Sequence, residues 1–194
     1  MYERVVATAS CHLLTVLGQA GVGKTRLIGE AVTDLPGATV LRGRCLSYGE
    51  GITYWPVAEL VRQAAGIADT DPPAEAVARL RRLLTDDRRG PGDPPGSPEE
   101  REREHIAARI AQLIGLEARP GPAEEAAWAF RRLLELLAGR GPLVVVLDDL
   151  HWAEPGLLDL VEQVAGYAAA PPSCWWPWPG PSSWSSGPAG PGAC

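Results

Sequence analysis

The fold of this chain is decided by the stretch Gly18-Gln19-Ala20-Gly21-Val22-Gly23-Lys24-Thr25. An apolar run at residues 13–17 precedes it, and a helical pattern follows it. The spacing fits G-x-x-x-x-G-K-[ST], in which the glycines let the backbone wrap a triphosphate with its N–H groups turned inward. A glycine-rich turn that merely holds a lysine is the alternative, but the strand before and the helix after favour a nucleotide site.

Each residue type in this loop has an expected task. Lys24 would reach the β- and γ-phosphate oxygens, and Thr25 would offer its hydroxyl to Mg²⁺. The helix that opens at Lys24 adds the positive end of its dipole. The residues predicted to bind the nucleotide are Gly18, Gln19, Ala20, Gly21, Val22, Gly23, Lys24, Thr25 and Arg26. ATP and Mg²⁺ are the predicted cofactors.

A second informative stretch is Leu143-Val144-Val145-Val146-Leu147-Asp148-Asp149. Its unbroken apolar run is typical of a strand buried on both faces of a parallel sheet, and α/β sheets place their ligands at the carboxyl ends of such strands. This Walker B pattern predicts that Asp148 holds Mg²⁺ together with Thr25. Two acids that merely end a strand are the alternative, which the phosphate loop upstream disfavours.

Two residues are predicted to take part in catalysis, Lys24 and Asp149. Lys24 contacts the phosphates, and Asp149 lies where related ATPases keep the carboxylate that orients or deprotonates the attacking water. The predicted magnesium ligands are Thr25 and Asp148.

The strand before the phosphate loop, the helix after it and the next strand make a βαβ unit, which predicts an α/β fold with a parallel sheet. With the phosphate loop, this predicts the three-layer αβα form of a P-loop NTPase, here incomplete. The expected strands are residues 13–17, 38–42 and 143–147. The expected helices are residues 24–34, about 55–66, from about 73, from about 98, and one that ends near Gly139. Residues 88–98, rich in proline and glycine, are expected to form a mobile loop.

Composition narrows the class of protein. The formal net charge of -6 and the pI of about 5.1 give no electrostatic footprint for nucleic acid, so no direct nucleic acid binding by this chain is expected. Four widely spaced cysteines suggest reduced thiols rather than a zinc site. No apolar run is long enough to span a membrane, and no secretion signal is apparent, so a cytoplasmic location is expected.

Three blocks carry a resemblance to a known family: Leu41-Arg42-Gly43-Arg44-Cys45, Tyr48-Gly49-Glu50-Gly51-Ile52-Thr53-Tyr54-Trp55-Pro56 and Leu147-Asp148-Asp149-Leu150-His151-Trp152-Ala153-Glu154-Pro155. Together they resemble the ATPase domain of bacterial STAND-type signalling proteins, which belongs to the AAA-like P-loop group. This domain occurs in large LuxR-type transcriptional regulators and beside class III adenylate/guanylate cyclase domains.

The resemblance implies an ATP-driven switch that controls an attached output domain, either DNA-binding or cyclase. Asp149 is shorter than the glutamate of fast AAA ATPases, which implies slow or lost hydrolysis. Members usually begin with a further segment that helps hold the adenine, so the start is expected to be truncated. His151 and Trp152 match a family signature and are expected to pack beside the site.

Two other functions stay open. A P-loop kinase would transfer phosphate to a small molecule and usually needs an arginine-bearing lid, for which Arg79, Arg81 and Arg82 are the clustered candidates. A non-functional fragment that acts only as a protein-binding piece is the third possibility.

The resemblance stops near residue 168, so residues 1–168 are expected to form a partial ATPase domain and residues 169–194 a disordered tail. The segment Cys174-Trp175-Trp176-Pro177-Trp178-Pro179-Gly180-Pro181 must be encoded TGY TGG TGG CCN TGG CCN GGN CCN. Read from the third letter, with C at the free positions, this spells Leu-Val-Ala-Leu-Ala-Arg-Pro. That is the strand that the family places here, centrally in the sheet, so a frameshift is expected rather than a genuine Pro/Trp-rich interaction tail.

Overall fold

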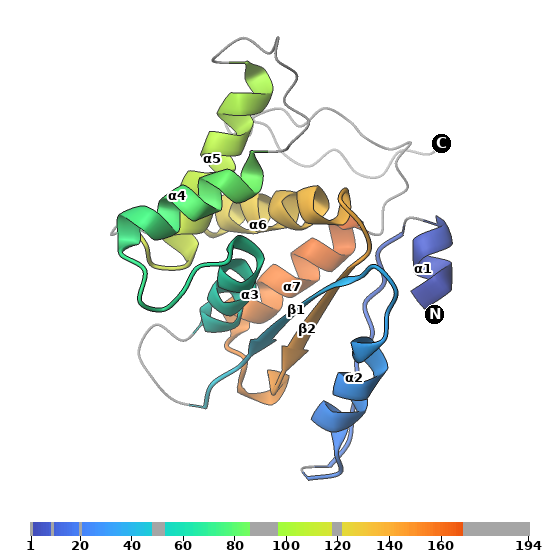
Figure 1. The fold of residues 1–194 in the computed structure, drawn as a ribbon. Coiled ribbons are helices and arrows are strands. Elements are labelled where there is room, and N and C mark those ends of the chain that lie inside the picture. The colour runs from blue at the N-terminus through green and yellow to red at the C-terminus, as the bar shows by residue number, and fades with distance from the viewer. Residues whose placement is uncertain are drawn as a thin grey trace, which may run out of the picture.

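The computed structural model describes residues 2–8, 10–19, 21–47, 53–85, 97–117 and 122–168. Its elements are, in chain order, α1 (Tyr2–Thr8), α2 (Lys24–Thr33), β1 (Thr39–Arg44), α3 (Trp55–Ala65), α4 (Pro73–Leu84), α5 (Pro98–Leu113), α6 (Ala123–Ala138), β2 (Leu143–Asp148), the 3₁₀ turn η1 (Leu150–Trp152) and α7 (Pro155–Ala168). Figure 1 shows α4, α5 and α6 gathered at one end of the strands, while α1 and α2 stand apart from them. This is a mixed α/β arrangement, consistent with an incomplete P-loop domain.

The two strands form a parallel sheet in the described part of the chain, as the sequence predicts for residues 38–42 and 143–147. The register pairs Thr39 with Leu143 and Arg44 with Asp148. At the far end the N–H of Cys45 donates to the carbonyl oxygen of Asp148 at 3.0 Å. Because the strands are parallel, their carboxyl ends share one edge of the sheet, where the predicted site residues lie.

Local signals place the helix ends where the sequence predicts them. Gly66 ends α3 in the left-handed conformation, with φ 63°, which a residue without Cβ adopts at little cost. Ser97 begins α5, and its side chain accepts a hydrogen bond from the N–H of Glu100. These caps satisfy backbone groups that the helices leave unpaired, so they fix the boundaries of both helices.

Helix α3 covers the outer edge of β1 with side-chain hydrogen bonds. The Gln63 amide accepts from the N–H of Arg42 at 2.9 Å and donates to the Arg42 carbonyl oxygen at 2.5 Å. The Glu59 carboxylate accepts from the N–H of Arg44 at 2.7 Å. An open strand edge is a template for unwanted pairing, so these side chains protect β1 in place of a further strand.

Gly43 lets α3 approach this closely. A Cβ built on Gly43 would lie 2.5 Å from the carbonyl oxygen of Pro56, which belongs to the backbone of α3. We predict that Gly43→Ala lowers the free energy of unfolding by about 1 to 3 kcal/mol, because the helix must shift away from the strand. Urea unfolding would measure the loss. Gly141→Ala is the matched control, since its Cβ would lie an ordinary 3.6 Å from the carbonyl oxygen of Gly37. Equal effects of the two substitutions would contradict the prediction.

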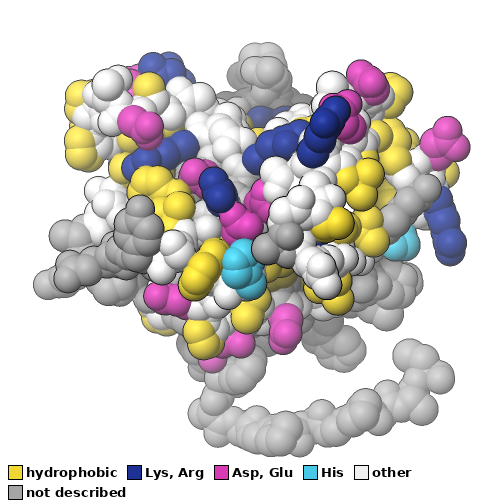
Figure 2. Space-filling view, turned by 90° about the horizontal axis from the view of Figure 1, so that it is seen from below, with side chains coloured by type: hydrophobic (Ala, Val, Ile, Leu, Met, Phe, Trp, Pro, Cys, Tyr) yellow, Lys and Arg dark blue, Asp and Glu magenta, His cyan; other side chains and the backbone are white. Residues whose placement is uncertain are grey.

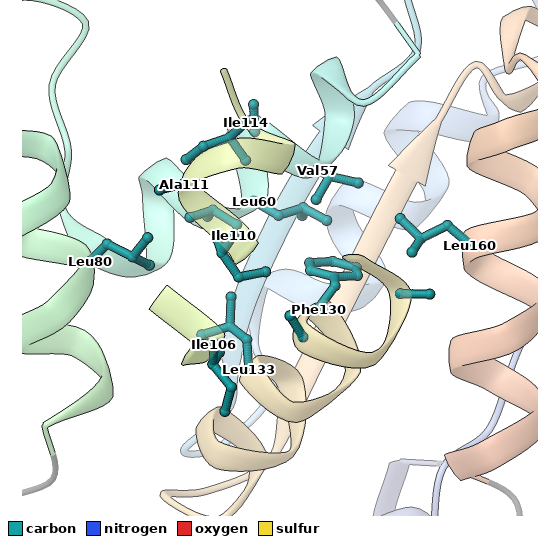
Figure 3. Close-up of a cluster of buried hydrophobic side chains, with 14 of the residues drawn as sticks. Val57, Leu60, Leu80, Ile106, Ile110, Ala111, Ile114, Phe130, Leu133 and Leu160 are labelled. Atoms are coloured by element: carbon teal, nitrogen blue, oxygen red, sulfur yellow. The ribbon is translucent and has the colours of Figure 1, made fainter. Parts of the chain in front are cut away.

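The apolar core lies where helices α3 to α7 meet, and Figure 3 shows part of it. Its side chains come from α3 through α7 and include Val57, Leu60, Leu80, Ile106, Ile110, Ala111, Ile114, Phe130, Leu133 and Leu160. No polar or charged residue of the described ranges is buried among them. This core anchors α3, and α3 in turn holds β1 in place.

The predicted first strand at residues 13–17 is wrong for this structure. These residues form no strand, and the side chains of Leu13, Leu14 and Leu17 are 64%, 68% and 87% exposed. A strand is stable only beside a neighbour, and within the described ranges β2 pairs with β1 alone. The apolar run therefore lacks the strand neighbour that it would need, because the free edge of β2 is not paired with it.

Two sequence predictions fall mainly on residues that lie outside the described ranges. Most of the expected loop at residues 88–98, up to residue 96, lies outside the described ranges. Its last two residues, Ser97 and Pro98, form the cap and the first residue of α5. The expected tail, residues 169–194, lies entirely outside them. Among the described helices, none combines the length and apolar character that crossing a bilayer requires.

Candidate functional site

The phosphate-type loop closes around the Lys24 ammonium. Gly21 and Gly23 have φ values of 78° and 93°, a region that a residue with Cβ rarely adopts, and Gly23 directly precedes α2. The Lys24 Nζ donates to the carbonyl oxygens of Gly18 at 2.8 Å and Gln19 at 2.9 Å. The Lys24 side chain therefore reaches back from the start of α2 to the residues that begin the loop.

The two motifs meet at one hydrogen bond. The Thr25 hydroxyl donates to Oδ2 of Asp148 at 2.8 Å, although 123 residues separate the two in sequence. Thr25 occupies the first turn of α2, and Asp148 ends β2. The pair brings together the two side chains that the sequence predicts as magnesium ligands.

These two side chains fit the coordination habits of Mg²⁺. Mg²⁺ usually takes one or two protein oxygens and completes its shell with phosphate oxygens and water. Within the described residues, no group of three His, Cys, Asp or Glu side chains could hold a metal without such help. The hydroxyl of Thr25 and the carboxylate of Asp148 would therefore hold the ion only together with a polyphosphate.

Asp149 follows in an unusual conformation. It is the one non-glycine residue of the described ranges with positive φ, at 56°, and its N–H donates to Oδ1 of Asp148 at 2.9 Å. Its Oδ2 accepts from Nε of Arg44 at 2.8 Å, and Nη2 of Arg44 lies at the same distance. The Asp149 side chain is 27% exposed and that of Arg44 68%, so this ion pair sits at the surface.

Arg44 is a site residue that sequence reasoning missed. Its position could have been found from the block Leu41–Cys45, because parallel pairing with the strand before Asp149 places Arg44 opposite Asp148. Arg44, at the carboxyl end of β1, can then reach Asp149, the residue that follows β2.

A cavity of about 230 Å³ adjoins this cluster. Its walls come from α2, β1, α3 and β2, and the lining residues are Thr25, Ile28, Arg42, Gly43, Arg44, Glu59, Val146 and Asp148. Two arginines and two carboxylates thus line the space. Figure 2 looks from below onto the molecule and shows acidic and basic side chains gathered near the centre of that face, beside a histidine.

Cys45 lies next to this cluster but is unsuited to nucleophilic chemistry. Its side chain is buried, with 4% of its surface exposed. Burial raises the pKa of its thiol, and the negative charges of Asp149, Asp148 and Glu59 raise it further. The thiol therefore stays protonated at neutral pH, and Cys45 serves as a small apolar residue.

Other predicted residues lie around the loop. Gly18, Gln19, Val22 and Arg26 are exposed on the loop and the first turn of α2, and Ala20 lies outside the described residues. His151 and Trp152 are exposed rather than packed, and their rings contact each other with centroids 5.0 Å apart.

The comparisons with known proteins show the family of the chain. The AAA ATPase domain family matches residues 1–175. The uncharacterized protein R02095 of Rhizobium meliloti (strain 1021) is 31% identical over 171 residues, which cover 85% of this chain and 16% of that protein. No solved structure matches the chain significantly. The chain therefore belongs to the AAA ATPase domain family.

Proposed function

We propose that this chain is the Mg²⁺–ATP-binding switch module of a bacterial signal-transduction or transcription-regulatory ATPase of the STAND type. The observation that carries the proposal is the hydrogen bond between Thr25 and Asp148, which unites the hydroxyl and the carboxylate expected around Mg²⁺. Lys24 binds the phosphates from the loop, and the N-terminus of α2 adds its dipole. When bound, Mg²⁺ neutralises charge on the phosphate oxygens.

Asp149 is the proposed base for hydrolysis. Its carboxylate would orient or deprotonate a water that attacks the γ-phosphate. In this structure Nε and Nη2 of Arg44 both contact Oδ2 of this carboxylate, so the ion pair holds the side chain in place. A short side chain held by a cation suits slow turnover, as a switch requires.

The rival kinase has weaker support. Arg79 pairs with Asp71 and Glu75, and Arg82 also pairs with Glu75. Arg81 pairs with Glu104, and none of the three arginines lines the cavity at Thr25 and Asp148. Arg79 and Arg82 thus pair within α4 and with a residue shortly before it, and Arg81 pairs with α5, so the arginines that a lid would need are engaged elsewhere.

The hydrolysis assay separates the two functions. We predict slow release of ADP and phosphate from ATP in water without any added acceptor, and a further fall of at least about tenfold in kcat for Asp149→Asn. Phosphate release followed over hours would measure both. Glu117→Gln, on a described residue away from the cavity lining, serves as control. ADP release that depends strictly on an added metabolite would favour the kinase.

Partners and location follow from the same proposal. The chain spans 16% of the length of the relative R02095, so an output domain, DNA-binding or cyclase, would belong to a longer protein. We propose that this module exchanges ATP and ADP in the cytoplasm and does not itself bind nucleic acid, since its net charge is -6.

A further inference from the structure

One contact ties the start of α3 to the start of α7. The Thr53 hydroxyl donates a hydrogen bond to Oε2 of Glu154, although 101 residues separate them. Thr53 lies two residues before α3, and Glu154 directly precedes Pro155, the first residue of α7. Both residues therefore lie just before the N-terminus of a helix.

Close packing supports this hydrogen bond. A Cβ built on Gly156 would lie 3.3 Å from Cγ2 of Thr53 and 3.3 Å from the hydroxyl oxygen of Tyr54. The two segments therefore approach so closely that a side chain at Gly156 would crowd Thr53 and Tyr54. At the same place the carbonyl oxygen of Tyr54 accepts from the N–H of Ala58 at 2.9 Å, and that of Glu154 from the N–H of Leu157 at 3.0 Å. The contact joins the first turns of two helices.

The segment that this contact holds carries the proposed base. It runs from Asp149 to Glu154 and consists mainly of the turn η1. Arg44 of β1 binds its first residue, and Thr53, before α3, binds its last. Gln63 and Glu59 of α3 form hydrogen bonds to β1. The segment is therefore held at both ends by the unit that β1 and α3 form.

We propose that Thr53 and Glu154 are positioning residues, and we call their contact the Thr53–Glu154 latch. The inference rests on the proposed function: the latch fixes the segment after Asp148 relative to β1 and so orients Asp149 beside Thr25. It touches neither phosphate nor Mg²⁺. The Glu154 carboxylate suits this place because it accepts the hydroxyl and also meets the positive end of α7. Because the contact is exposed, its loss acts on local opening rather than on global stability.

Hydrogen exchange on the full chain tests the latch without requiring activity. Thr53→Val, which removes the donor and keeps the shape, should speed amide exchange in the first turn of α7 about fivefold. Glu154→Ala should do the same in the first turn of α3, across the contact. Thr53→Ser keeps the hydroxyl and should exchange like the parent. Glu162→Ala, an exposed carboxylate on α7, is the matched control.

The outcomes separate this inference from the proposed function. Exchange that rises only in the helix next to each substitution would reduce both residues to local caps and overturn the latch. Steady-state ATP hydrolysis gives the second readout: Glu154→Ala should lower kcat about fivefold with KM unchanged. A parent chain that binds no Mg²⁺–ATP would defeat the proposed function, whereas the exchange result would still decide whether the latch exists.

Discussion

Lys24→Ala is expected to abolish measurable binding of Mg²⁺–ATP. The Lys24 ammonium lies inside the loop, within 2.9 Å of the carbonyl oxygens of Gly18 and Gln19, where a polyphosphate would meet it. Losing a charge-assisted contact of this kind costs about 3 kcal/mol or more, which corresponds to an affinity loss of at least about a hundredfold. Titration with a fluorescent ATP analogue would measure it.

Arg101→Ala provides the control for this loss. Arg101 is an exposed cation on α5, so its removal changes the net charge equally without touching the loop. Both variants should be measured in the chain as it is and in a frame-restored form, because the intact domain is expected to bind more tightly. An unchanged affinity in Lys24→Ala would remove the basis of the site assignment.

The second large effect concerns the sheet. We propose that a strand encoded after residue 168 in another reading frame belongs between β2 and residues 13–17. In the described residues β2 pairs only with β1, and Leu13, Leu14 and Leu17 are exposed. A frame-restored chain should gain about five ladder hydrogen bonds at ~1 kcal/mol each, before any burial. That is a large part of a typical stability of about 5 to 15 kcal/mol.

Urea unfolding of the two chains, side by side, measures the gain. The frame-restored chain should unfold cooperatively at a clearly higher urea concentration. The chain with the present sequence should unfold earlier and be more prone to aggregate through the unpaired edge of β2. Equal and cooperative stability in both chains would defeat the frameshift as an account of the fold. The encoding DNA, read in all frames, gives an independent check.

The sequence predicted those features that local chemistry determines. Gly66 and Ser97 mark helix ends through backbone conformation and capping, and short apolar stretches located β1 and β2. Thr25 and Asp148 could be paired because each motif assigns its residue to the same ion, and the structure brings them within 2.8 Å. Such signals need no knowledge of distant neighbours.

Contacts between distant segments left no such signal. The latch of Thr53 with Glu154 spans 101 residues, so no periodicity reveals it. The ion pair of Arg44 with Asp149 follows only when the pairing of β1 with β2 is taken into account. Residues 13–17 show the converse error. Their apolar pattern is that of a buried strand, but a strand depends on neighbours that the pattern itself does not contain.

The magnesium site is tested most directly by a calorimetric titration of the chain with ATP, with and without Mg²⁺, beside the variant Asp148→Asn. We predict one binding event that weakens at least about tenfold when Mg²⁺ is removed, and an Asp148→Asn variant that no longer responds to Mg²⁺. Equal affinity with and without Mg²⁺ in the parent chain, or an undiminished Mg²⁺ response in Asp148→Asn, would contradict the assignment of Thr25 and Asp148 as the magnesium ligands.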